Sequence, residues 1–190
     1  EELEAQKEEN ARHFDKEKYP EDKNVAIPFV EDIEILVTEL MKVCCGGGRG
    51  DPEDWAGALS TALVSLQWRP NSKKCIVLIS DANAHGRRFC GIDDFNEEEE
   101  VLERNVRMMA ERQIYFVGIN VIKRDEGCAM TLREMKTIYE RYGGRSFVTE
   151  EFRPQYNELL GEDNWPRNVL DEFIATISKS IARLGDLEDF

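Results

Sequence analysis

CGGGRGDPEDWAGALSTALVSLQWRPNSKKCIVLISDANAHG, residues 45–86, is the stretch of sequence that decides the fold. Its glycine-rich start can adopt backbone conformations that are closed to residues with a Cβ. Asp51 and Pro52 then stand at the N-cap and the first position of a predicted helix. Cys75–Ile79 is a continuous apolar run, which is typical of a strand covered on both faces. Asp81 follows at the carboxyl end of this strand, which is where open α/β sheets bind ligands.

The helix predicted after Pro52 has one apolar face. Glu53 and Asp54 add negative charge to its first turn, where the helix dipole favours it. We expect the helix to end before Arg69, which precedes a proline. Its buried side chains are expected to be Trp55, Leu59, Ala62, Leu63 and Leu66.

Three further strands are predicted, at Val25–Phe29, Ile114–Ile122 and Arg145–Thr149. Pro28 places the first of them at a sheet edge, because proline cannot donate a ladder hydrogen bond. The apolar runs at Cys75–Ile79 and Ile114–Ile122 are expected to be adjacent and inside the sheet.

Helices alternate with these strands. They are expected at residues 31–43, at residues 97–112, from the capping-box pair Thr131 and Glu134 to Gly143-Gly144, and from about Pro166 onward. The first is expected to bury Ile33, Leu36, Val37, Leu40 and Met41, and the last Val169, Leu170, Phe173, Ile174, Ile177, Ile181 and Leu184. This alternation predicts a three-layer α/β fold with an open, mostly parallel sheet and helices on both faces.

Composition restricts the class of partner. The formal net charge of −14 argues against nucleic acid and against an anionic membrane surface. No apolar run approaches the roughly 20 residues of a membrane span, and no signal-peptide pattern is present. The five cysteines are an odd number and two lie inside apolar patterns, which favours reduced thiols and a cytoplasmic location.

Two segments differ sharply in composition. Residues 1–24 are almost wholly polar and are interpreted as a charged helix or a disordered segment. Residues 25–190 contain the predicted strands and helices and form one domain.

The motif GGG-x-x-D-PED-x-x-GAL, followed by an apolar strand that closes in SDA-x-x-HG, resembles von Willebrand factor A (vWA) domains. The intracellular vWA domains of alpha-kinases are the variety it is most similar to. Residues 46–58 and 79–86 carry the resemblance, which extends more loosely over residues 25–184.

The resemblance implies a site for one divalent cation, usually Mg²⁺, at the carboxyl edge of the sheet. Asp81 matches the ligand of the family's third loop, and Asp51 falls where the second loop supplies its ligand. Each also has a purely structural interpretation, Asp81 as a turn cap and Asp51 as a helix N-cap. The first loop, D-x-S-x-S, is absent, because no aspartate in the chain has serine two positions later.

This departure implies an incomplete domain. We expect the chain to be part of a longer polypeptide. The first ~80 residues of the domain are then expected to be removed or to be contributed by another chain. The alternative is a decayed vWA domain without a metal. No cofactor is expected for this chain alone, and Mg²⁺ is expected if the missing loop is supplied.

The loops at this edge contain other candidate binding residues. Gly48, Gly50, Asp54, His85, Arg87 and Arg88 are expected to line a protein-binding surface there. His85 is interpreted as a structural part of its loop, since no nucleophile with a matching acid is recognisable beside it. Arg87 or Arg88, which follow Asp81 closely, is expected to fold back over this loop and relieve part of the repulsion between Asp51 and Asp81.

Two function classes follow. The first is a non-catalytic interaction module that docks a protein partner, or the missing N-terminal part of the same domain, within a larger intracellular assembly. The second is the regulatory or targeting domain of an alpha-kinase-like serine/threonine kinase whose catalytic domain lies elsewhere. No kinase active site is recognisable in these 190 residues, so the second rests on the resemblance alone.

Overall fold

The computed structural model describes residues 26–42, 52–93, 95–122, 126–154 and 167–186. In chain order its elements are α2 (Ile33–Leu40), α3 (Trp55–Ser60) with a π-helical continuation at Thr61–Ser65, β1 (Cys75–Ser80), α4 (Arg87–Cys90), α5 (Asn96–Glu111), β2 (Tyr115–Val121), α6 (Ala129–Arg141), β3 (Phe147–Phe152) and α7 (Arg167–Asp186). None of the helices in this part of the chain is both long and apolar enough to cross a membrane.

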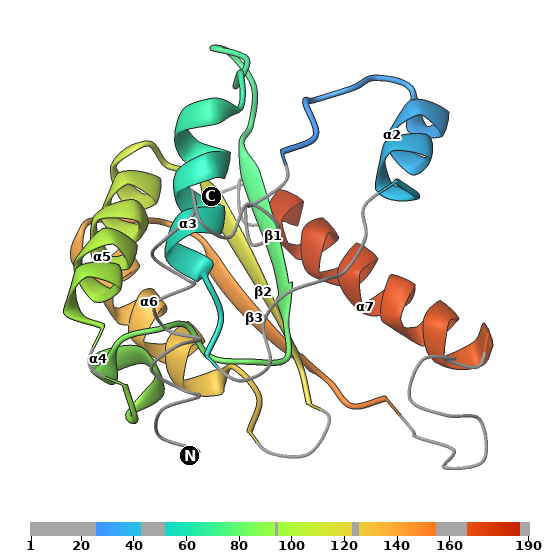
Figure 1. The fold of residues 1–190 in the computed structure, drawn as a ribbon. Coiled ribbons are helices and arrows are strands. Elements are labelled where there is room, and N and C mark those ends of the chain that lie inside the picture. The colour runs from blue at the N-terminus through green and yellow to red at the C-terminus, as the bar shows by residue number, and fades with distance from the viewer. Residues whose placement is uncertain (1–25, 43–51, 94, 123–125, 155–166, 187–190) are drawn as a thin grey trace.

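The sheet is parallel throughout and has the strand order β1-β2-β3. Val77 pairs with Val117, and Gly118 pairs with Thr149. Helices α3, α4, α5 and α6 cover one face, and α7 covers the other (Figure 1). The chain is therefore a three-layer α/β domain with an open parallel sheet, as the sequence predicts.

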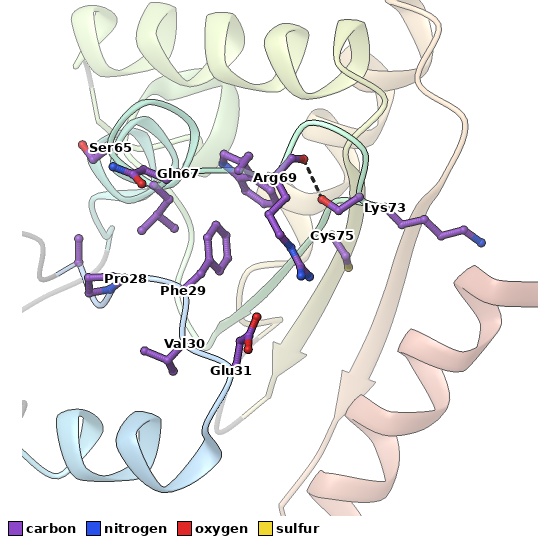
Figure 2. Close-up of a pocket in the computed structure, with 13 residues that line it drawn as sticks. Pro28, Phe29, Val30, Glu31, Ser65, Gln67, Arg69, Lys73 and Cys75 are labelled. Carbon is purple, nitrogen blue, oxygen red and sulfur yellow. Dashed lines mark hydrogen bonds between the residues drawn. The ribbon is translucent and has the colours of Figure 1, made fainter.

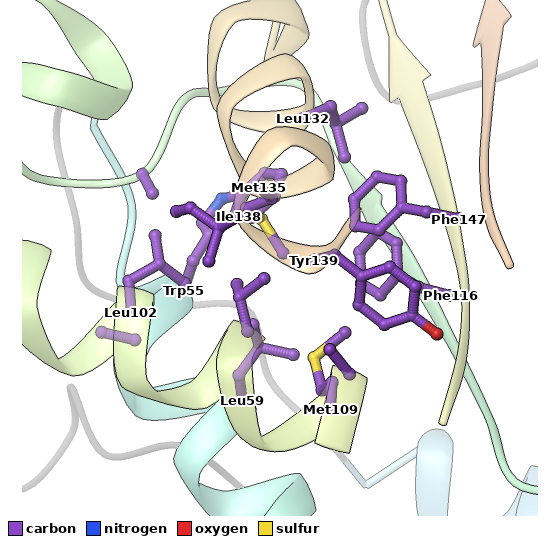
Figure 3. Packing of buried hydrophobic residues seen from close by; sticks show 14 of the residues in the cluster. Trp55, Leu59, Leu102, Met109, Phe116, Leu132, Met135, Ile138, Tyr139 and Phe147 are labelled. Carbon is purple, nitrogen blue, oxygen red and sulfur yellow. The ribbon is translucent and has the colours of Figure 1, made fainter. Parts of the chain in front are cut away.

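The larger core lies between the sheet and helices α3, α5 and α6. The side chain of Trp55 is 3% exposed and lies in one cluster with Leu59, Leu102 and Met135 (Figure 3). Phe116 and Phe147 stack with ring centroids 4.4 Å apart and close the cluster against the sheet. The predicted burial of Trp55 is confirmed.

The smaller core lies under α7. It joins Val117, Ile119 and Val121 of β2 to Phe152 and Val169, with Phe173 and Ile177 partly buried against them. The prediction that Leu170, Ile174 and Ile181 are buried is wrong, because these side chains are 45%, 52% and 44% exposed. Helix α7 packs on the sheet through a narrow stripe, so the other apolar residues of its predicted face remain in solvent. The side chain of Leu184 lies outside the described residues.

Helix α3 begins three residues later than predicted. Its N-cap is Asp54, whose Oδ1 accepts a hydrogen bond of 2.6 Å from the Gly57 amide. Glu53 instead pairs with the loop after β1, where its amide donates to the Asn83 carbonyl at 2.8 Å. This extended pairing excludes Pro52 and Glu53 from the helix. Asp51, the predicted cap, lies outside the described residues.

Helix α6 begins at Ala129, so Thr131 is inside the helix rather than at its cap. The capping-box prediction fails because the Thr131 hydroxyl makes tertiary hydrogen bonds instead. The helix ends near Gly143, whose φ of +78° is a left-handed conformation that glycine adopts without strain. Strand β3 starts at Phe147, two residues after the predicted start.

The predicted edge strand at Val25–Phe29 is not found. Residues 26–29 form no strand, Val25 lies outside the described residues, and the Phe29 ring instead meets Trp68 edge-on at 5.1 Å. Helix α2 forms within the predicted range, yet none of its residues is buried, so its predicted apolar stripe is not covered. Strand β1 consequently lies at an edge of the described sheet, whereas the sequence predicts that it is inside.

Candidate functional site

The carboxyl edge of the sheet begins with the turn that follows β1. The Ser80 hydroxyl donates to the Ala82 carbonyl at 3.0 Å and lies 3.3 Å from the Ala82 amide. Ala82 is buried and Asp81 is exposed. The turn therefore buries its alanine and places the Asp81 carboxylate at the surface of the edge.

Thr131 joins three segments of this edge. Its hydroxyl accepts a hydrogen bond of 2.9 Å from the Ala84 amide, and its single hydrogen faces the Asn83 side-chain oxygen at 3.0 Å and the Phe89 carbonyl at 3.1 Å. The Asn83 oxygen also accepts from the Thr131 amide at 3.1 Å. Thr131 is fully buried. It therefore fixes the loop after β1 to α4 and α6.

Asn120, near the end of β2, likewise fixes a loop by hydrogen bonds, here the loop that follows β2. Its side-chain oxygen accepts from the Cys128 amide at 2.8 Å, and its amide nitrogen donates to the Glu126 carbonyl at 2.9 Å. The Cys128 sulfur lies 3.4 Å from the Ser80 carbonyl. Burial, with a further contribution from the charge of Asp81, raises the pKa of the Cys128 thiol to about 12. This thiol is therefore protonated at neutral pH and acts as a donor to the β1 backbone.

His85 is held by a residue that the sequence does not single out, Asp93. The His85 Nδ1 lies 2.7 Å from Asp93 Oδ2, and Asp93 Oδ1 accepts from the Gly86 amide at 2.7 Å and the Phe95 amide at 3.3 Å. The Phe95 ring packs edge-on against the imidazole at 5.1 Å. With His85 only 6% exposed, this arrangement closes the loop between β1 and α5.

Arg88 does not fold back over Asp81 as predicted. Its Nη1 lies 2.6 Å from Glu103 and its Nε contacts Glu134, while its amide donates to Glu99 at 3.0 Å. Two carboxylates on α5 and α6 thus hold the guanidinium through charge-assisted hydrogen bonds. Arg87, the first residue of α4, is exposed.

The metal hypothesis concerns Asp51 and Asp81, of which the structure describes Asp81. Within the described ranges there is no group of three or more His, Cys, Asp or Glu side chains that could hold a metal ion. Asp51, Gly48 and Gly50 lie outside those ranges, and Asp54 caps α3. Of the two predicted ligands, Asp81 alone is placed, at the exposed end of β1.

Sequence reasoning missed the framework of Thr131, Asn83, Asn120 and Asp93. The sequence holds a usable signal for both asparagines, since Asn83 follows the predicted strand Cys75–Ile79 and Asn120 lies near the carboxyl end of the predicted strand Ile114–Ile122. For Thr131 the sequence pattern instead predicts a helix cap. Its partners are more than 40 positions away along the chain, so local sequence patterns do not reveal them.

Comparison with known proteins shows a similarity over part of the chain. Alpha-protein kinase vwkA of Dictyostelium discoideum is 34% identical to this chain over 59 residues, which are 31% of this chain and 9% of that kinase. The chain thus matches a small part of the relative's length. No protein-family model matches the chain.

Proposed function

We propose that residues 25–190 are a vWA-like scaffold that acts as a non-catalytic protein-interaction module of a larger intracellular, cytoplasmic protein. Its partner docks on the loops at the carboxyl edge of the sheet. The open parallel α/β fold and the partial similarity to an alpha-protein kinase support this proposal. The observation that carries it is the buried hydrogen-bond framework beneath an exposed, charged edge.

This framework gives the edge loops a fixed shape. Thr131 and Asn120 are buried and bond backbone groups of the loops after β1 and β2. Asp93, which lies between α4 and α5, also fixes the loop after β1 by accepting from the Gly86 amide. Loops that are ordered before binding lose less conformational entropy when a partner docks, which favours affinity.

The surface above the framework has charges of both signs. Asp81 and Arg87 are exposed and belong to the turn after β1 and the first residue of α4. Charges at the rim of an interface mainly set partner choice and association rate. A partner with a basic group opposite Asp81 and an acidic group opposite Arg87 fits this edge.

A metal contribution remains part of this proposal. Asp81 and Asp51 bind Mg²⁺ when the first loop of the family is supplied from elsewhere, and a partner carboxylate then completes the coordination. The chain alone lacks D-x-S-x-S, so its affinity for Mg²⁺ is expected to be no better than millimolar.

The second candidate function is a regulatory or targeting domain of an alpha-kinase-like serine/threonine kinase. The similarity to vwkA favours it, since that relative is an alpha-protein kinase and the match covers 9% of its length. In this case the catalytic domain lies elsewhere on the same polypeptide, and the carboxyl edge contacts that domain or its substrate.

Affinity capture of the full-length protein from its own cells tests both functions. Asp81→Lys and Arg87→Glu change the edge, and Arg141→Glu is a matched control because Arg141 is an exposed residue at the opposite end of α6. If the domain is an interaction module, both edge variants should fail to capture the same partner proteins, and the Arg141→Glu control should still capture them. Equal capture by all four proteins contradicts it.

Phosphate transfer from ATP by the same captured proteins separates the two candidates. Kinase activity that falls with the edge variants and not with Arg141→Glu supports the regulatory domain. Full-length protein without any phosphate transfer excludes that candidate and leaves the interaction module.

A further inference from the structure

Two apolar side chains lie on the surface at the corner where α4 meets α6 (Figure 1). Ile92, which follows the end of α4, is 75% exposed, and Met130, the second residue of α6, is 38% exposed. Between them, a Cβ placed on Gly91 would lie 3.8 Å from the Sδ and Cε atoms of Met130. The segment of Ile92 therefore contacts the end of the Met130 side chain, and we call Ile92 and Met130 the corner patch.

The backbone on both sides of Ile92 is fixed. Gly91 ends α4 in a left-handed conformation with φ of +82°, and its amide donates to the Arg87 carbonyl at 2.8 Å. On the other side, Asp93 Oδ2 lies 2.7 Å from Nδ1 of the buried His85. Because Ile92 stands between a helix end and a buried anchor, it loses little conformational freedom when a partner covers it.

The other half of the corner patch has an equally firm base. Next to Met130, the buried Thr131 hydroxyl lies 3.1 Å from the Phe89 carbonyl of α4, and Arg88 of α4 contacts Glu134 of α6. These contacts hold the two helices together, so Ile92 and Met130 keep their relative position. The unbranched thioether of Met130 can still adjust to the shape of a partner, as methionine does at many binding surfaces.

Charges of both signs stand around the corner patch, in different segments. Asp81 and Glu126 are exposed in the loops that follow β1 and β2. Arg87 and Arg133 are exposed on α4 and α6, the two helices that meet at the patch. Arg133 is one helical turn after Met130 and so lies on the same side of α6. Charge complementarity therefore favours an acidic partner group beside Arg133.

We propose that Ile92 and Met130 are the apolar anchor of the docking surface at the carboxyl edge. They bind a short polypeptide segment in which a large apolar side chain covers the patch and a nearby acidic residue pairs with Arg133. A few buried anchors supply most of the affinity of an interface, whereas charges at its rim mainly set partner choice and association rate. This inference rests on the proposed interaction-module function and specifies what its partner carries.

The experiment uses the full 190-residue chain and a displayed library of random peptides of about twelve residues, which is roughly three helical turns. Selected peptides are labelled with fluorescein, and fluorescence anisotropy measures their dissociation constants. Ile92→Ser and Met130→Ser change the patch. Ile33→Ser is the matched control, because Ile33 on α2 is 67% exposed and lies on a different part of the chain. Circular dichroism confirms that the variants fold.

The selected peptides are expected to share a large apolar residue with an acidic residue within about four positions, since side chains on adjacent helical turns are about 5–6 Å apart. Their binding should weaken at least about tenfold in Ile92→Ser and Met130→Ser and stay unchanged in Ile33→Ser. Arg133→Glu should weaken binding as well, and changing the peptide's acid to lysine should restore it. Failure to select any peptide, a shared sequence without the acid, or unchanged binding to Ile92→Ser overturns the inference.

A second apolar surface provides a competing location for such peptides. A cleft of about 960 Å³ at the amino end of β1 is lined by Phe29 and Val30, among others (Figure 2). Peptides that lose affinity for Val30→Ser and keep it for Ile92→Ser lie in this cleft and overturn the inference.

The failure of this inference differs from the failure of the proposed function. Peptides that lose affinity for Asp81→Lys but not for Ile92→Ser overturn the corner patch as anchor and leave docking at the carboxyl edge in place. Equal capture of cellular partners by the wild type, Asp81→Lys, Arg87→Glu and the control contradicts the proposed function itself, whatever the peptides do.

Discussion

The two faces of the sheet are covered to very different extents. On one face, α3, α5 and α6 bury a continuous core in which Phe116, Met135 and Tyr139 are at most 1% exposed. On the other face, α7 covers a small cluster, while Ile174 and Leu170 of α7 remain about half exposed. Stability is therefore expected to depend on the first face, and the second has apolar surface available for association.

The largest effect is expected from a large-to-small substitution in the covered face. Trp55→Ala should lower the free energy of unfolding by about 3–5 kcal/mol, because it leaves a cavity between α3 and α5. Urea unfolding monitored by circular dichroism measures this change. A folded Trp55→Ala protein with an unchanged midpoint would show that this core does not dominate stability.

A smaller loss is expected in the loop framework. Thr131→Val keeps the shape of the side chain and leaves the Ala84 amide without its hydroxyl acceptor, which should cost about 1–3 kcal/mol. Thr137→Val is the matched control on α6, because Thr137 is exposed and, among the described residues, its hydroxyl bonds its own helix at the Arg133 carbonyl. If both variants unfold at the same urea concentration, the framework does not stabilise the loop.

The exposed carboxylate should contribute still less. Asp81→Asn is expected to change stability by under ~1 kcal/mol, since the residue lies at the surface. Calorimetric titration of the unmodified chain with Mg²⁺ and Mn²⁺ should give a dissociation constant no lower than millimolar. A micromolar constant that Asp81→Asn abolishes would mean that other ligands replace the D-x-S-x-S loop.

The smallest effect is expected on the open face of α7. Ile174→Ala should change stability by no more than about 0.5 kcal/mol, because this side chain is 52% exposed. The neighbouring Phe173 provides the contrast, since its ring packs on Phe152 with ring centroids 4.9 Å apart. Phe173→Ala should therefore lower the free energy of unfolding by more than Ile174→Ala does. Equal decreases in the melting temperatures of the two variants would contradict this, because they would mean that Ile174 is as well packed as Phe173.

Some of this architecture could be predicted from the sequence because it is encoded locally. The apolar runs at Cys75–Ile79 and Ile114–Ile122 identify two adjacent strands, of which the second is buried, and the spacing of apolar residues identifies α5. The position of β1 in the sheet could not be predicted in the same way. A continuous apolar run indicates which faces are to be covered, and does not show whether a neighbouring strand is present.

The candidate site was predicted less well for a related reason. Asp81 follows a recognisable strand, so its place at the carboxyl edge follows from local sequence. Thr131 and Asp93 act through tertiary contacts with Ala84 and His85, and the same residues also fit ordinary cap and loop roles. Only the folded chain decides between such roles.

Amide hydrogen exchange in β1, measured residue by residue by nuclear magnetic resonance on the free chain, tests most directly whether β1 is paired on one side only. One side of this strand is paired with β2, and the other is an edge of the described sheet. The amides of Ile76 and Leu78 face β2 and should be protected, and those of Val77 and Ile79 should exchange at least about tenfold faster. Equal protection of all four amides would contradict the account, because it would show that β1 is already paired on both sides.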